Sequence, residues 1–152
     1  RDSGMRTRLV KGYKVVDRDT RMGSNAAMFK RRYGKDALLN KIKNNGLEKY
    51  FPTYGKGSTV KKTDYSLGIM AFETIKDAAE FQHDYGLEDF TEIVSVEGVL
   101  CRNQRKRIYS SVGCYPERLA HRKGRRRMSP PQGTVFFDWV KVGHNIAVDI
   151  AQ

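Results

Sequence analysis

The chain has few of the residues and patterns that define membrane, secreted or disulfide-stapled proteins. Only two of its 152 residues are cysteine, Cys101 and Cys114, and two cannot form a disulfide framework. Twelve residues separate them, unlike the short spacing of zinc ligands, so we expect reduced thiols in a cytoplasmic protein. No apolar run approaches the ~20 residues of a membrane-spanning helix, and the opening RDSGMRTR has no apolar signal core. We therefore expect a soluble protein with no membrane contact.

Motifs for catalysis are also missing. His83, His121 and His144 are too scattered to predict a metal site, and no serine or cysteine lies in a recognised nucleophile turn. Gly55-Lys56-Gly57-Ser58 resembles the end of a phosphate loop without its full spacing, which favours an ordinary turn. The sequence predicts no catalytic residue, no metal and no cofactor, and it favours a binding protein over an enzyme without deciding between them.

Positive charge is what the sequence has in excess, with 29 Lys and Arg against 17 Asp and Glu, a formal net charge of +12. Residues 1–62 hold 17 basic and 5 acidic side chains, residues 63–101 hold 1 and 9, and residues 102–127 hold 10 and 1. Blocks of one sign attract an oppositely charged partner. The alternative is that the acidic block neutralises a basic block within the fold or across a homo-oligomer.

The densest basic block, residues 102–127, is called the arginine tract because eight of its ten basic residues are arginine. Guanidinium groups bind phosphate oxygens in a bidentate way and stay charged at physiological pH, and the tyrosines within the tract can stack on bases. We expect residues 121–131 to form an exposed loop or arm, because Ser129-Pro130-Pro131 stops any helix. The predicted phosphate-binding residues are Arg102, Arg105, Lys106, Arg107, Tyr109, Arg118, Arg122, Lys123, Arg125, Arg126 and Arg127.

A second group of cations, the predicted secondary basic face, lies within residues 30–43. Ser24 and Asp36 are expected to cap two helices in this region, and Gly34 to end the first. Apolar residues at helical spacing would face the core and leave the cations in solvent. The face comprises Lys30, Arg31, Arg32, Lys35, Lys41 and Lys43.

The pattern along the chain predicts one α+β domain, residues 1–152, with a largely antiparallel sheet and about three helices. Thr74 is expected to cap the third helix, and Gly98 to mark a bulge. Strands are expected at residues 9–16, 66–72, 91–100, 107–112 and 133–142. In the last strand, Asp138 needs a partner or an edge, and alternation places Val135, Phe137 and Trp139 on one face and Phe136, Val140 and Val142 on the other.

Several short phrases carry a resemblance to known proteins. They are Gly12-Tyr13-Lys14-Val15-Val16, Phe72-Glu73-Thr74 with Ala78-Ala79-Glu80-Phe81, Glu92-Ile93-Val94, and Pro131-Gln132-Gly133-Thr134-Val135 with Val140-Lys141-Val142. In this order they resemble a loose group of small, uncharacterised tailed-phage proteins. The resemblance implies a phage or mobile-element origin and a place in the host cytoplasm, and it supplies no reaction. Some small phage proteins capture nucleotide signals, which an arginine-rich site with aromatics would suit.

The entry to the third predicted helix carries a second resemblance. Phe72, Thr74, Ala78 and Phe81 are similar to the F-[ST]-T-x-x-x-A-x-x-F pattern near the NAD site of compact ADP-ribosyltransferases. Glu73 stands where that pattern has serine or threonine, and no glutamate follows in the usual catalytic context. The resemblance implies an NAD-using transferase as an alternative.

These observations predict non-enzymatic binding of a phosphate-bearing partner, with nucleic acid first. Three alternatives stay open. They are a captor of a small nucleotide, an ADP-ribosyltransferase-like enzyme, and a protein-binding module that uses the acidic residues of the segment 63–101.

Overall fold

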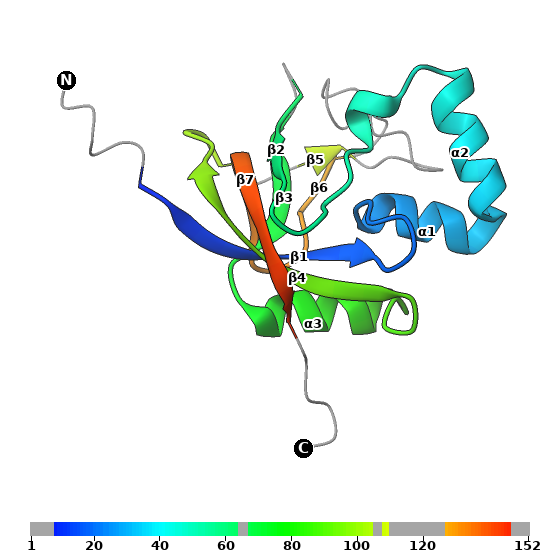
Figure 1. Cartoon of the computed structure of the whole chain (residues 1–152). Coiled ribbons are helices and arrows are strands. Elements are labelled where there is room, and N and C mark those ends of the chain that lie inside the picture. Colours follow the sequence, from blue (N-terminus) through cyan, green and yellow to red (C-terminus); the bar gives the residue numbers. More distant parts are fainter. Residues whose placement is uncertain (1–7, 64–66, 105–107, 110–126, 147–152) are drawn as a thin grey trace.

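The computed structural model describes residues 8–63, 67–104, 108–109 and 127–146, which fold as an α+β domain (Figure 1). The predicted combination is confirmed, because the described residues form three α-helices and their strands pair antiparallel throughout. In chain order the elements are β1 (Val10–Asp17), α1 (Ser24–Tyr33), α2 (Lys35–Asn44), the 3-10 turn η2 (Glu48–Tyr50), β2 (Thr59–Lys61), β3 (Ile69–Phe72), α3 (Ile75–Asp84), β4 (Thr91–Leu100), β5 (Ile108–Tyr109), β6 (Arg127–Met128) and β7 (Thr134–Ile146).

The strands of the main sheet close into a ring. β1 pairs with β3 at one edge and along its whole length with β4 at the other. β7 pairs with β4 at one edge, and with β2 and β3, one after the other, at its second edge. The cycle through β1, β4, β7 and β3 therefore forms a small antiparallel barrel. Such a short ring needs sharp local bends, and bulges in the β4–β7 pairing supply them.

One of these bulges corrects the predicted faces of β7. The pairing with β4 skips Asp138, so that residue is an extra one in the strand. An extra residue shifts the alternation, and Phe137 consequently shares the interior cluster with Val140 and Val142 instead of a face with Trp139. Gly98, the predicted bulge position, lies two residues before this shift, and a Cβ there would overlap the carbonyl oxygen of Trp139.

The apolar core has separate parts on the two sides of the barrel wall. Val16, Val94, Phe137 and Val140 lie with their neighbours in the interior cluster. α3 covers the outer face of β1, β3 and β4 through a second cluster formed by Val15, Phe72, Ala78, Phe81, Leu87 and Ile93. Each valine, leucine, isoleucine or phenylalanine side chain contributes roughly 1.5–3 kcal/mol when fully buried. The predicted cap of α3 is confirmed, since Asp77 N–H donates to Thr74 Oγ1 at 3.0 Å.

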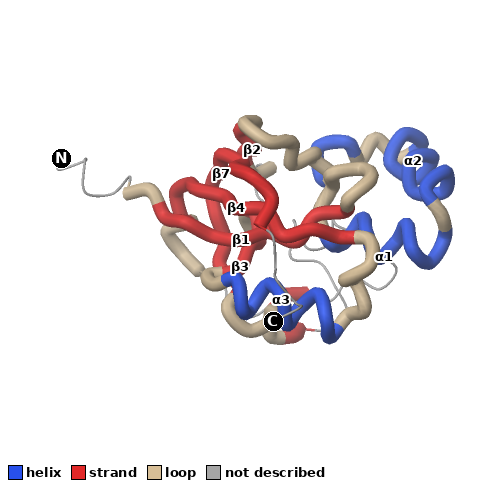
Figure 2. Tube along the Cα trace, turned by 60° about the horizontal axis from the view of Figure 1, so that its bottom comes forward, coloured by secondary structure: helices blue, strands red, loops and turns tan. Residues whose placement is uncertain are grey.

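α1 and α2 form a helical hairpin beside the barrel, around a small cluster of their own (Figure 2). Gly34, at φ 97°, ends α1 as predicted and directly precedes α2. The predicted caps are wrong, because Ser24 and Asp36 lie inside the helices and the cap positions are Gly23 and Gly34. Each of the three described α-helices has ten residues, too few to cross a lipid bilayer.

Candidate nucleic-acid interface

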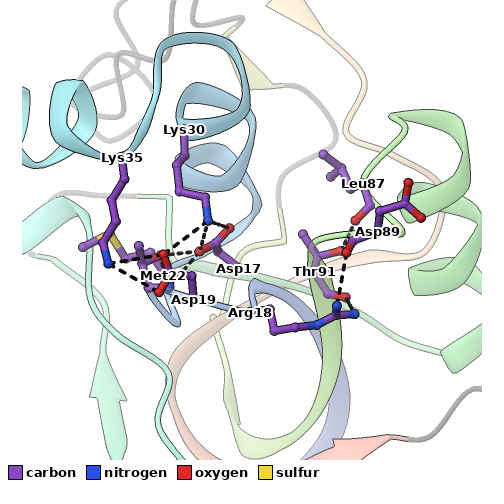
Figure 3. A network of polar contacts seen from close by, with 10 residues as sticks. Asp17, Arg18, Asp19, Met22, Lys30, Lys35, Leu87, Asp89 and Thr91 are labelled. Atoms are coloured by element: carbon purple, nitrogen blue, oxygen red, sulfur yellow. Dashed lines mark hydrogen bonds and ion pairs between the residues drawn. The ribbon is translucent and has the colours of Figure 1, made fainter.

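Asp17 organises the turn that joins β1 to α1 (Figure 3). Its carboxylate is fully buried and accepts hydrogen bonds from the N–H and hydroxyl of Thr20, at 2.7 and 2.9 Å, and from Lys30 Nζ at 3.1 Å. Burial alone raises the pKa of Asp17, but these donors outweigh it and hold the pKa below its ordinary value. Lys30 is therefore part of the fold and not of an open basic surface.

The neighbouring arginines pair with the acidic block of the sequence. Arg21 Nη1 lies 2.8 Å from Glu92 Oε2, and Arg18 Nε lies 3.5 Å from Glu92 Oε1. Arg18 also donates to the carbonyl of Asp89 at 3.1 Å. The alternative of neutralisation within the fold is thus confirmed for these two cations of the first basic block.

The predicted secondary basic face is not one open surface, because protein groups bind several of its cations. Lys35 Nζ lies 3.2 Å from Asp19 Oδ2, and Arg31 Nη1 donates to the carbonyls at the end of α3, at 2.8 Å to Gly86. A cation is favourable at that position because the carbonyls of a helix C-terminus are unpaired and negative. Arg32, whose guanidinium lies over the Tyr33 ring, and Lys43 have no carboxylate partner among the described residues, and the ammonium of Lys41 lies over the Phe29 ring.

The structure describes residues 102–104, 108–109 and 127 of the arginine tract. Arg102 is exposed and forms no ion pair with any described residue. β5 pairs with β6, which places Tyr109 opposite Arg127 in register. The predicted strand 107–112 thus contains β5, and the described part of the expected arm 121–131 includes β6. The remaining predicted binding residues, Arg105, Lys106, Arg107, Arg118, Arg122, Lys123, Arg125 and Arg126, lie outside the described residues.

Gln104 fixes the start of the tract to the barrel. Its amide nitrogen donates to the carbonyls of Cys101 and Phe136, each at 2.9 Å, and its amide oxygen accepts from Phe136 N–H at 2.8 Å. The side chain replaces a neighbouring strand at this point of β7. Arg102 therefore lies in a segment whose backbone is held against the barrel by Gln104.

A third basic surface, which the sequence did not predict, lies on a part of the outer face of the barrel that no described helix covers. We call it the lysine-tryptophan face: Leu9, Lys11, Thr59, Lys61, Glu97, Val99, Trp139 and Lys141. The register forms one row of Lys11, Glu97, Lys141 and Thr59 and a second row of Val99, Trp139 and Lys61. In Figures 1 and 2 the helices lie beside and below the strands, and no described helix covers the end of the sheet where β2 and β7 meet. Each of β1, β2 and β7 supplies one lysine to this face, so no pattern within a single strand marks it.

Lys14 is a buried cation that the sequence did not single out. It lies on the interior side of β1, where Nζ donates to the Met70 carbonyl at 2.7 Å and lies 4.7 Å from the Tyr54 ring centroid. Burial lowers the pKa of Lys14 to about 8. Burial also raises the pKa of Tyr54. Neither group has a charged partner among the described residues that could serve acid–base chemistry.

The remaining reactive groups do not assemble into a catalytic or metal site within the described residues. Cys101 is buried, and burial together with the nearby Asp138 carboxylate raises the pKa of its thiol to about 12. Asp138 has the partner it was expected to need, since Lys62 Nζ lies 2.9 Å from its carboxylate. His83 is exposed beside Glu88, at 3.3 Å. The described part of the chain contains no group of three or more His, Cys, Asp or Glu residues placed to hold a metal ion.

Comparisons with protein-family models, with curated proteins and with solved structures find no match for this chain.

Proposed function

We propose that this protein binds nucleic acid through the arginine tract, as a non-enzymatic partner of phosphate groups. The observation that carries the proposal is the charge of residues 102–127, where ten basic side chains stand against one acidic. Such a density of guanidinium groups repels itself unless an anion neutralises it, and phosphates match its geometry.

The structure supports the proposal at the ends of the tract and beside the barrel. Arg102 is exposed next to the segment that Gln104 anchors, and Tyr109 and Arg127 lie opposite each other in register. Arg32 and Lys43 on the helical hairpin are exposed, and no described carboxylate pairs with either. Lys30, Arg31 and Lys35 are left out of the proposed interface, because protein groups already occupy them.

The test is the anisotropy of labelled duplex DNA, single-stranded DNA and RNA, titrated with the protein over a range of salt. If six phosphates are neutralised, log affinity should fall with log salt at a slope of about −5 on duplex DNA and about −4 on a single strand. Affinity that is independent of salt, or no binding at low salt, would contradict the proposal. Thermal stabilisation by mono-, di- or cyclic nucleotides without binding of any oligonucleotide would favour the nucleotide captor instead.

Matched variants assign the binding to the tract. Replacing Arg122, Arg125 and Arg126 with glutamine removes three charges, and the salt slope on single strands should become shallower by about 2. The control replaces three exposed lysines of other segments, Lys49, Lys56 and Lys76, with glutamine and keeps the same net charge. An equal loss of slope in both variants would mean that total charge, and not the tract, decides the affinity.

A further inference from the structure

We propose that the lysine-tryptophan face holds a single-stranded segment of nucleic acid, with Trp139 stacked on one base and the lysines on the neighbouring phosphates. This inference rests on the proposed function and specifies the form of the partner.

The register places Lys61 and Lys141 beside one indole and Lys11 farther along the same face. Lys61 pairs directly with Trp139, and Lys141 follows Trp139 by two residues on the same side of β7. Lys11 and Lys141 both lie opposite Glu97, from the two edges of β4. Side chains that are opposite on neighbouring strands have Cβ atoms about 4.5–5.5 Å apart, so Lys61 lies beside the indole. Lys11 lies two strand spacings from Lys141, about 10 Å, so the three cations line the face over the length of a few nucleotides.

The position of Trp139 allows a base to stack on its indole. It is partly exposed, and it belongs to none of the four hydrophobic clusters formed by the described residues. Its indole has no ring contact and no hydrogen bond with a described residue. The bulge at Asp138 is the reason, because it turns Phe137 inward and leaves Trp139 outside. A base stacked on the indole would cover apolar area that water now meets.

The charge of the face is complementary to phosphate. Lys11, Lys61 and Lys141 are exposed and form no ion pair with any described residue, and Glu97 is the one carboxylate of the face. Lysines in water hold phosphates as point charges without a fixed geometry. In a duplex the base faces are stacked inside, whereas an unpaired strand presents bases and phosphates together. The combination of an accessible indole with lysines therefore fits a single strand.

The first measurement uses the fluorescence of Trp139, which is the only tryptophan of the chain. Titration with an oligothymidylate or an oligouridylate should quench the indole emission with the same midpoint as the anisotropy of the labelled strand. A duplex of the same length should leave the emission of Trp139 nearly unchanged at saturation. Stacking on the indole would produce this difference, and contact at any other surface would not.

Variants of the face give the second measurement. Trp139→Leu keeps an apolar side chain without the ring, and it should weaken single-strand binding by about five- to 150-fold, the range of one base stacked on an aromatic. The aromatic control is Tyr85→Leu, at an exposed tyrosine next to α3. The double variant of Lys61→Gln with Lys141→Gln should reduce the salt slope by about 1.4, against a control with Lys49 and Lys76 replaced. Circular dichroism establishes that each variant is folded.

The variant Glu97→Gln distinguishes an effect on the interface from a general loss of structure, because it should increase the affinity for a single strand. Removing a carboxylate about 7 Å from a phosphate is worth about threefold in water. Destabilisation of the fold would lower the affinity, so it cannot account for tighter binding.

The outcomes are distinct. Salt-dependent binding with unchanged Trp139 emission, or with Trp139→Leu and Glu97→Gln both equal to the wild type, overturns the face as the docking site and leaves the proposed function standing. Binding of duplex DNA without binding of single strands would also overturn the face as the docking site and leave the proposed function standing. No binding of any nucleic acid overturns both proposals, and capture of a protein partner by the face in place of oligonucleotide also overturns this inference.

Discussion

Replacement of Asp17 by asparagine tests the buried ion pair that joins β1 to the helical hairpin. In the wild type the carboxylate is fully buried and Lys30 Nζ lies 3.0 and 3.1 Å from its two oxygens. Asparagine has nearly the same shape but no charge, and it puts an NH2 donor in place of one of the two oxygens that face the ammonium. Removing one partner of a buried pair costs about 3–5 kcal/mol. Because Lys30 keeps 17% of its side chain exposed and Asp19 lies 3.7 Å away, we expect a loss at or just below the lower limit of this range, about 2–3 kcal/mol.

Equilibrium unfolding in urea measures this loss. With a slope of about 2 kcal/mol per molar, within the range of small proteins, the midpoint of Asp17→Asn should fall by about 1–1.5 M at pH 7. The sign of the pH dependence follows from the lowered pKa of Asp17 in the folded state. The contribution of its charge is complete above the ordinary value of 3.8 and is lost as the pH falls through the lower folded value. The difference between wild type and variant should therefore be constant near neutrality and shrink below about pH 4.

The controls distinguish the buried pair from its exposed neighbours. Asp19→Asn removes a half-exposed carboxylate that pairs with Lys35, and it should cost less than about 1 kcal/mol. Adding Lys30→Met to Asp17→Asn should recover stability, because no cation is then left without its partner. Two results would refute the importance of the buried pair. One is a free energy of unfolding of Asp17→Asn within about 0.5 kcal/mol of the wild-type value, and the other is a loss of stability that stays the same below pH 4.

Three further predictions concern other buried groups. Between pH 8 and 10.5 the free energy of unfolding of the wild type should rise by up to about 3 kcal/mol relative to that of Lys14→Met, because the unfolded chain holds the lysine proton to higher pH than the folded one. A difference between the two urea midpoints that does not change with pH in this range would contradict the lowered pKa of Lys14. Gln104→Ala should cost about 1–3 kcal/mol in urea unfolding, because it leaves Phe136 N–H without its acceptor, whereas Asn103→Ala, at an exposed neighbour, should have almost no effect. Iodoacetamide at pH 8 should leave Cys101 unmodified in the folded protein and alkylate it in urea, as peptide mass spectrometry would detect; rapid labelling of the folded chain would contradict the raised pKa and the burial.

Local sequence signals predicted the elements whose limits depend on neighbouring residues. Thr74 caps α3 because its hydroxyl reaches a backbone N–H only three residues along the chain. Gly34 ends α1 because a positive φ favours glycine. Ser24 and Asp36 carry the same chemistry as Thr74, but glycines take the cap positions and both residues lie within helices. Capping propensity alone does not decide between two adjacent candidates.

The candidate surfaces differ in how visible they are in the sequence. The arginine tract is contiguous, so counting charges along the chain finds it. The lysine-tryptophan face takes one lysine from each of β1, β2 and β7, and its row exists only after the strands pair. Conversely, Lys30 and Arg31 are neighbours in a basic run, yet the fold uses them to hold Asp17 and the end of α3. Charge counts contain no information about which cations meet an acceptor.

The sequence by itself determined the α+β class, the sites of most strands, the cap of α3 and the separation of charge into blocks, because these follow from residues within a few positions of one another. Only the tertiary structure decided that the sheet closes into a barrel, that the bulge at Asp138 sends Phe137 inward and Trp139 outward, and which cations remain open to a partner. Those features depend on contacts between residues far apart in the chain, and a shift of one residue in strand register reverses the faces on which they rest.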